Sequence, residues 1–149
     1  MLVNECMSNY VELGRPDMSL KEVACLMRDG DFGFLPIQEN DKLVGTITDR
    51  DITIRAVASG LSPDTTKVHE VMSKKVLYCF EDQSLEEVTR NLGDNQVRRL
   101  PVLNRDKRLV GVLSLGDISL SEFSPEQFEA AVSRISQSAP ASRSGRNMQ

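Results

Sequence analysis

The sequence predicts an α/β fold of the α+β type, in which two copies of one small unit pack on each other around a pseudo-two-fold axis. Two observations lead to this prediction. An internal repeat covers most of the 149-residue chain, and each copy changes from helical to strand periodicity in the same order. The composition agrees: 40% hydrophobic residues are enough for a core, and with only 5% aromatics that core depends on Val, Leu, Ile and Met.

The internal repeat divides the chain. Three segments of the first copy recur, two at a spacing of 65 residues and the third after a slip of one: 3–8 in 68–73, 17–23 in 82–88, and 43–45 in 109–111. The extra residue lies in a polar turn, which comprises 39–42 in the first copy and 104–108 in the second. The backbone of such a turn faces water and tolerates an insertion. We therefore expect repeat 1 at 1–60, a linker at 61–67 and repeat 2 at 68–121.

A helix is expected early in each copy. Ser19 is followed three residues later by Glu22, which is the spacing of a capping box, and Ser84 is followed in the same way by Glu87. Apolar residues then recur at helical intervals, in the first copy at Leu20, Val23, Ala24 and Met27.

A β-hairpin should follow this helix. The short apolar runs 34–37 and 43–47 flank a polar turn, and runs 99–102 and 109–113 take the same place in the second copy. We expect Pro36 to lie at a strand end, because proline cannot donate a ladder hydrogen bond.

Helical spacing resumes from Asp49 to Ala58 and ends at Gly60, a suitable residue for a helix end. Each copy thus follows the order helix, two strands, helix. Neither copy could cover both faces of its small sheet alone, so we expect the two copies to pack together.

The C-terminal part is expected to begin with a helix. Ser124 is suited to cap it and Pro125 to be its first residue, so that the helix covers 124–136. The remaining stretch, 137–149, is rich in Ser, Ala and Arg and is predicted to be disordered.

Charge and cysteine usage exclude several classes of protein. A net charge of −4 and a pI near 5.1 provide no long-range attraction for nucleic acid or an anionic membrane. The three cysteines lack CxxC spacing, so we expect reduced, buried thiols and no metal site. The N-terminus lacks signal-peptide features and no apolar run approaches the roughly 20 residues of a membrane span, so we expect a cytoplasmic protein.

Four short signatures occur in the same order in both copies. In the first copy they are Met-Ser at 7–8, Pro-Asp-Met-Ser-Leu at 16–20, Leu-Pro-Ile at 35–37 and Leu-Val-Gly-Thr-Ile-Thr-Asp-Arg-Asp-Ile at 43–52. From residue 3 to about residue 120 the chain therefore resembles a tandem pair of CBS (cystathionine-β-synthase) domains. It especially resembles short stand-alone bacterial proteins made of one such pair, sometimes called a Bateman module.

The resemblance implies two β-α-β-β-α repeats with two similar clefts between them, and a homodimer of such modules. It also implies an adenosine compound as ligand, such as AMP, ADP, ATP, NAD or S-adenosylmethionine. No metal is implied.

Two segments that join a strand to a helix are the candidate nucleotide sites, because free backbone N–H groups gather there. Thr48 and Ser114 supply hydroxyls for a phosphate. Asp51 and Asp117, three residues later, supply carboxylates that can accept both hydroxyls of a ribose. The same residues also suit helix capping. The resemblance implies contact with ligand at these positions, and both roles can hold at once.

The two copies differ in basic residues. Arg98 and Arg99 precede the second Leu-Pro and could bind phosphates, although exposed arginines are common on any surface. The cleft around Ser114 and Asp117 is therefore the better candidate for a phosphorylated ligand. We expect the start of the first copy to cover it with Tyr10 and Glu12, whose carboxylate would repel phosphates.

The other cleft, around Thr48 and Asp51, has Phe34 in place of an arginine. Its expected further contacts come from Arg50 beside it and from the start of the second copy, at Lys75 and Leu77. It could bind a second nucleotide or none.

Four residues are candidates for an apolar wall against adenine, although Ile37 and Val102 suit an ordinary sheet core better. They are Pro36, Ile37, Pro101 and Val102. His69 has no acid, thiol or serine partner in the sequence, and we expect it to be structural or exposed.

We expect a binding module that senses adenylate charge or a dinucleotide and passes a change of conformation to an unidentified regulated protein. The alternative is a structural or interaction module with vestigial clefts. An enzyme is the weakest hypothesis, because neither a catalytic triad nor a Walker-type Gly-Lys-Thr pattern occurs.

Overall fold

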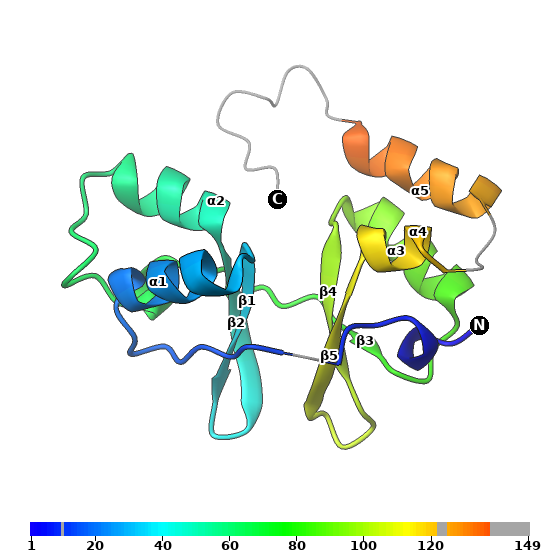
Figure 1. The fold of residues 1–149 in the computed structure, drawn as a ribbon, viewed down its shortest axis with the longest axis horizontal. Coiled ribbons are helices and arrows are strands. Elements are labelled where there is room, and N and C mark those ends of the chain that lie inside the picture. Colours follow the sequence, from blue (N-terminus) through cyan, green and yellow to red (C-terminus); the bar gives the residue numbers. More distant parts are fainter. Residues whose placement is uncertain (10, 122–124, 138–149) are drawn as a thin grey trace. The chain divides into compact units, whose positions relative to one another are not determined.

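The computed structural model describes residues 1–9, 11–121 and 125–137 (Figure 1). The chain divides into two compact units, whose positions relative to one another are not determined. Unit 1 comprises Met1–Val11 and the chain from Leu77 onward, and unit 2 comprises Glu12–Val76. The start of repeat 1 therefore belongs to the unit that holds most of repeat 2.

Unit 2 contains a two-stranded antiparallel sheet with helical segments beside it. Its elements are α1 (Leu20–Gly30), β1 (Phe34–Glu39), β2 (Lys42–Thr48), α2 (Asp49–Asp51), the π-helical η2 (Ile52–Val57) and the 3₁₀ segment η3 (Val68–Glu70). The segment predicted as one helix from Asp49 is thus a short α-helix that widens into a π-helix. Gly60, with φ of 74°, follows its end.

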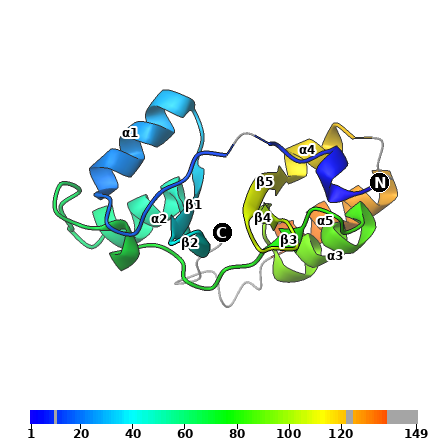
Figure 2. The ribbon, with the colours of Figure 1, turned by 90° about the horizontal axis from the view of Figure 1, so that it is seen from below.

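Unit 1 contains a three-stranded sheet in the order β3-β4-β5, with β3 parallel to β4 and β5 antiparallel to it. Its elements are η1 (Val3–Glu5), β3 (Cys79–Phe80), α3 (Leu85–Asn95), β4 (Arg99–Leu103), β5 (Leu109–Ser114), α4 (Leu115–Ser119) and α5 (Pro125–Ser136). Figures 1 and 2 show α5 lying beside α3. None of the described helices is both long and apolar enough to span a bilayer.

The predicted capping box of the first helix is confirmed. The Ser19 hydroxyl accepts a hydrogen bond from the Glu22 N–H at 3.1 Å, and the Glu22 carboxylate accepts one from the Ser19 N–H at 2.9 Å. The apolar face of α1 is buried, but Ala24 is exposed because it lies beyond the edge of that face. Helical spacing alone therefore does not mark the edge of the buried face.

Both prolines lie inside their strands and not at a strand end, which corrects the sequence prediction. Pro36 is the third residue of β1 and faces Thr46, and Pro101 is the third residue of β4 and faces Val112. The carbonyl groups of Thr46 and Val112 accept hydrogen bonds from the N–H groups of Ser73 and Ser8, outside the hairpins, so neither carbonyl needs an N–H from proline.

The expected one-residue slip between the copies lies in the hairpin turn. In unit 2 the turn consists of Asn40 and Asp41, which both have positive φ, of 53° and 64°. These values are typical of the two-residue turns that match strand twist. In unit 1 the loop is longer and only Lys107 has positive φ, of 61°.

A short Met-Ser segment from each repeat pairs with the hairpin of the other repeat. Ser8 exchanges two backbone hydrogen bonds with Val112 in β5, of 2.9 and 3.0 Å, and Ser73 exchanges two with Thr46 in β2, of 2.8 and 3.0 Å. Figure 1 shows the dark blue N-terminal segment lying against β5. The exchange is the reason why the compact units differ in their boundaries from the sequence repeats.

Glycine makes this close approach possible. A Cβ atom at Gly111 would lie 2.6 Å from the Ser8 carbonyl oxygen and 2.8 Å from the Met7 sulfur. At Gly45 it would lie 2.8 Å from the Ser73 carbonyl oxygen and 2.7 Å from the Met72 sulfur. The glycine of each Leu-Val-Gly signature is therefore required by packing.

Each unit has its own apolar core between its sheet and its helices. The core of unit 1 consists of Val3, Cys79, Leu85, Val88, Leu92, Leu100, Val102, Leu113, Ile118 and Ile135. The core of unit 2 consists of Met18, Leu20, Val23, Met27, Leu35, Ile37, Ile47, Ala56, Val68 and Val71.

The substitution Gly111→Ala should lower the free energy of unfolding by about 2 kcal/mol, because the added methyl group overlaps the Ser8 backbone. Chemical denaturation of both proteins measures the change. Gly116→Ala is the matched control: its Cβ would meet nothing closer than the Ser114 hydroxyl at 3.6 Å, and alanine favours the helix. Equal stability of the two variants would contradict the packing argument.

Candidate functional site

The predicted hydroxyl and carboxylate residues cap the helices that follow β2 and β5. The Thr48 hydroxyl accepts from the Asp51 N–H at 3.0 Å, and the Asp51 carboxylate accepts from the Thr48 N–H at 2.9 Å. Ser114 and Asp117 form the same pair, with distances of 3.1 and 3.0 Å. Capping is therefore confirmed in both copies, while contact with a ligand stays a prediction.

The two carboxylates differ in their remaining oxygen. Oδ1 of Asp51 pairs with Nε of Arg55 at 3.8 Å, and Arg55 also donates to the Val71 carbonyl at 3.0 Å. Oδ1 of Asp117 forms no hydrogen bond or ion pair with any residue that the structure describes. Asp117 is half-buried and keeps an acceptor for a further group.

A pocket of about 420 Å³ lies on unit 1, where β4 begins and β5 ends. It is lined by Arg98, Arg99, Ser114, Leu115, Gly116, Val132, Ile135 and Ser136. The structure thus brings together three residues that the sequence analysis had singled out, Arg98, Arg99 and Ser114. The backbone fixes this arrangement, because the Leu115 N–H donates to the Arg98 carbonyl at 3.0 Å.

The last turns of α5 form one wall of this pocket, with Val132, Ile135 and Ser136. These residues were not predicted from the sequence to belong to the site. Their apolar spacing indicated only that the helix had a buried face, and a spacing does not tell which groups that face will meet.

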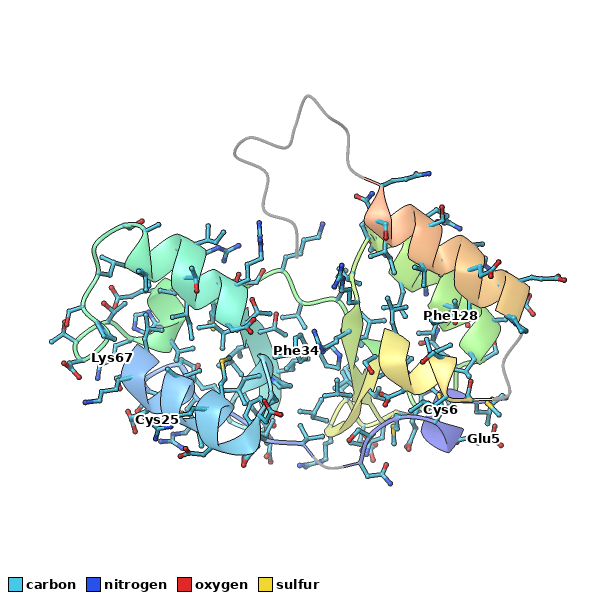
Figure 3. The ribbon with its side chains drawn as sticks, turned by 45° about the horizontal axis from the view of Figure 1, so that its top comes forward. Glu5, Cys6, Cys25, Phe34, Lys67 and Phe128 are labelled. Carbon is cyan, nitrogen blue, oxygen red and sulfur yellow. The ribbon has the colours of Figure 1, made fainter. Side chains whose placement is uncertain are left out.

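The corresponding part of unit 2 has the opposite electrostatic character. Gly33 and Phe34 stand where unit 1 has Arg98 and Arg99, and Asp49 stands where unit 1 has Leu115. A Cβ at Gly33 would lie 2.6 Å from the Asp49 carboxylate, so this acidic group lies directly beside the start of β1, where Figure 3 labels Phe34. Unit 1 therefore offers the better environment for an anion.

The remaining candidates are divided between the two units and lie outside the unit 1 pocket. Arg50 and Lys75 are exposed on unit 2, and Glu12 is a half-buried residue of the same unit. Tyr10 lies outside the described residues. Leu77 belongs to unit 1, where it packs against the core. The expectation that Tyr10 and Glu12 cover the Ser114 site stays a prediction.

The four candidates for an adenine wall, Pro36, Ile37, Pro101 and Val102, are all buried in the strands. Ile37 and Val102 are 0% exposed and belong to the two cores, which confirms the sheet-core interpretation for this pair. Neither Pro101 nor Val102 lines the pocket of unit 1.

The three thiols are free, but only Cys79 is buried; Cys6 and Cys25 are half-buried, which corrects the expectation of three buried thiols. Burial raises the pKa of Cys79 to about 12, with a smaller contribution from Cys6. Burial also raises the pKa of Cys6, with Asp117 and Glu5 adding to the shift. Cys6 directly follows η1 and packs, half-buried, against the core of unit 1 (Figure 3).

His69 is exposed, as expected. Within the described ranges, no three His, Cys, Asp or Glu side chains gather closely enough to hold a metal ion.

Comparison with known proteins supplies independent evidence. A family model described as CBS domain matches the chain twice, at residues 3–57 and 68–121. The CBS domain-containing protein YhcV of Bacillus subtilis is 34% identical over 134 residues, which are 90% of this chain and 94% of YhcV.

Two solved structures are similar along most of the chain. Hypoxic Response Protein I, crystallised with two coordinated zinc ions, has a TM-score of 0.71 and 34% identity, covering 80% of this chain and 97% of that one. The CBS domain pair of protein MJ0100, crystallised with 5-methylthioadenosine and S-adenosyl-L-methionine, has a TM-score of 0.70 and 29% identity, with the same coverage.

Cys79 should be the last thiol to react with an alkylating reagent in the folded protein at pH 8, because its raised pKa leaves almost no thiolate and its side chain is buried. Peptide mass spectrometry after timed labelling measures the order, and labelling in guanidinium provides the control in which all three react alike. Labelling of Cys79 as fast as Cys25 in folded protein would overturn this expectation.

The same shift predicts a loss of stability in alkali. The pKa of Cys79 is raised from 9.0 to about 12 on folding, so between these values the unfolded chain releases a proton that the folded chain keeps. The contribution of the neutral thiol to stability is therefore present below pH 9 and is lost as the pH rises toward 12.

Proposed function

Since the chain belongs to the CBS domain family, whose model matches both of its repeats, we propose that it is a regulatory module that binds an adenosine phosphate and catalyses no reaction itself. The observation that carries the proposal is the meeting of Arg98, Arg99 and Ser114 in one pocket of about 420 Å³. Two guanidinium groups and a hydroxyl are well suited to bind phosphate oxygens.

The adenosine class is supported by a relative. The CBS pair of MJ0100 was crystallised with two adenosine compounds that carry no phosphate. In this chain the two arginines favour a phosphorylated member of the class, namely AMP, ADP, ATP or NAD. Asp117 is not among the residues that line the pocket, but it is hydrogen-bonded to Ser114, which lines it. We assign its unpaired Oδ1 to a ribose hydroxyl.

Unit 2 is the weaker candidate for a phosphate. Its Asp49 carboxylate lies beside Gly33. Oδ1 of Asp51 forms an ion pair with Arg55, whereas the corresponding oxygen of Asp117 is unpaired. A ligand at Thr48 would have to depend on Arg50 and Lys75, which are exposed, as Arg98 and Arg99 are, and Arg50 directly follows the acidic Asp49. We therefore propose that unit 1 binds phosphate first.

The mechanism of regulation that we propose is a population shift. A ligand that binds one conformation better than another moves the equilibrium by the difference between its two affinities. In this view the module is a cytoplasmic homodimer that senses energy or redox state and passes the shift to a regulated protein.

A structural or interaction module with vestigial clefts is the second candidate. It is favoured by the capping geometry, because all four residues already take part in capping without a ligand: Thr48, Asp51, Ser114 and Asp117. In that case their chemistry serves the fold alone.

Isothermal titration with AMP, ATP, NAD and S-adenosylmethionine, on protein freed of carried-over ligand, tests the proposal. We expect binding of at least one phosphorylated compound, and we expect Arg99→Gln to weaken it about tenfold or more through loss of a charge-assisted hydrogen bond. Arg90→Gln, which removes an exposed arginine paired with Glu86 on α3, should bind as the wild type does. No heat with any of the four compounds would reject the proposal.

Asp117→Ala separates capping from ligand contact. It should lower the free energy of unfolding by about 1 kcal/mol without any ligand, since one capping hydrogen bond is lost. Ser84→Ala removes a comparable bond, from the Glu87 N–H, at the start of α3. We expect the ligand-induced rise in melting temperature to persist in Ser84→Ala and to shrink in Asp117→Ala. An equal rise in both would favour capping alone.

A further inference from the structure

Helix α5 (Pro125–Ser136) lies outside the residues that the family model matches, which end at 121. It nevertheless supplies three of the residues that line the unit 1 pocket, Val132, Ile135 and Ser136. The same pocket is lined by Arg98 and Arg99, which belong to the CBS repeat. The pocket is therefore polar on the side of the CBS repeat and mainly apolar on the side of α5.

The contact between α5 and α3 is close and specific. Ala131 is 2% exposed, and a Cβ built at Gly93 would lie 3.4 Å from the Ala131 Cα atom. Arg134 forms an ion pair with Asp94. Phe128, labelled in Figure 3, packs against the core of unit 1 at the other end of the helix. These contacts fix which face of α5 meets the pocket.

The end of α5 is also tied to the arginine segment. The side-chain amide of Gln96 donates to the carbonyls of Arg134 at 3.2 Å and Gln137 at 2.7 Å, which are terminal acceptors of α5. Gln96 precedes Arg98 by only two residues, and it has a left-handed backbone with φ of 55°. A ligand held by Arg98 and Arg99 thus lies next to the residue that caps α5.

We propose that α5 is the base-recognising wall of the pocket and that a bound ligand stabilises its contact with α3. This inference rests on the proposed binding of an adenosine phosphate by unit 1. The arginines hold the phosphate, and the apolar side chain of Val132, which is half-buried, packs against the purine ring together with Ile135. A helix outside the CBS repeats thereby selects the ligand and responds to it.

The polarity of α5 disfavours the reverse orientation of the ligand. The carbonyl end of a helix carries partial negative charge and disfavours a phosphate. Ser136, the last residue of α5, lines the pocket, so the phosphate belongs on the arginine side.

Two probes test the wall separately from the arginines, AMP and ribose 5-phosphate, which lacks the base. Val132→Ala should weaken AMP about tenfold, the effect expected for loss of a small apolar contact, and leave ribose 5-phosphate unchanged. Arg99→Gln should weaken both compounds. Ser133→Ala, an exposed position on the same helix, should bind both as the wild type does.

Hydrogen exchange of the full chain supplies a second readout. Saturating AMP should slow the exchange of the α5 amides severalfold, and ribose 5-phosphate should slow it less. One result would overturn the role of α5 and leave the proposed function standing. In this result Arg99→Gln abolishes AMP binding, but Val132→Ala binds AMP as the wild type does and AMP does not slow hydrogen exchange in α5. A wild-type protein that binds neither probe would overturn the role of α5, while the titration with ATP, NAD and S-adenosylmethionine decides separately whether the proposed function stands.

Discussion

The fold depends on two pairs of backbone hydrogen bonds that join each Met-Ser segment to the hairpin of the other repeat. Ser8 is bonded to Val112 and Ser73 to Thr46, in each case beside a glycine, Gly111 or Gly45, that leaves space for the approaching chain. Because of this exchange, unit 1 is assembled from both ends of the chain. The same bonds engage the residues opposite the two prolines, so each hairpin accommodates a proline inside its strand.

Once the hairpins are held in this way, the start of the first strand and the end of the second lie together, and small differences of sequence there decide the chemistry. Unit 1 has Arg98, Arg99 and Leu115 at positions where unit 2 has Gly33, Phe34 and Asp49. One unit therefore has a cationic pocket and the other has a carboxylate at the corresponding place. The framework is the same in both copies, while the charged residues at this place differ.

Much of the fold was predictable because its signals are local. Capping depends on residues three positions apart, so Ser19 with Glu22 and Ser114 with Asp117 could be recognised from spacing alone. The position of the one-residue slip followed from turn chemistry. The prediction that Pro36 lies at a strand end was wrong. The Thr46 carbonyl opposite Pro36 accepts its hydrogen bond from Ser73, far along the chain, and so needs no N–H from proline. A local pattern holds no information on such a partner.

By itself the sequence determined the duplication, the CBS family, the capping residues and the asymmetry in arginines, since each of these is written in residue types at fixed spacings. Only the tertiary structure decided that the two repeats exchange their Met-Ser segments, and that Val132 and Ile135 of α5 line one pocket with Arg98 and Arg99. These outcomes depend on which apolar faces pack together. Packing joins residues distant in sequence through contacts that no periodicity encodes.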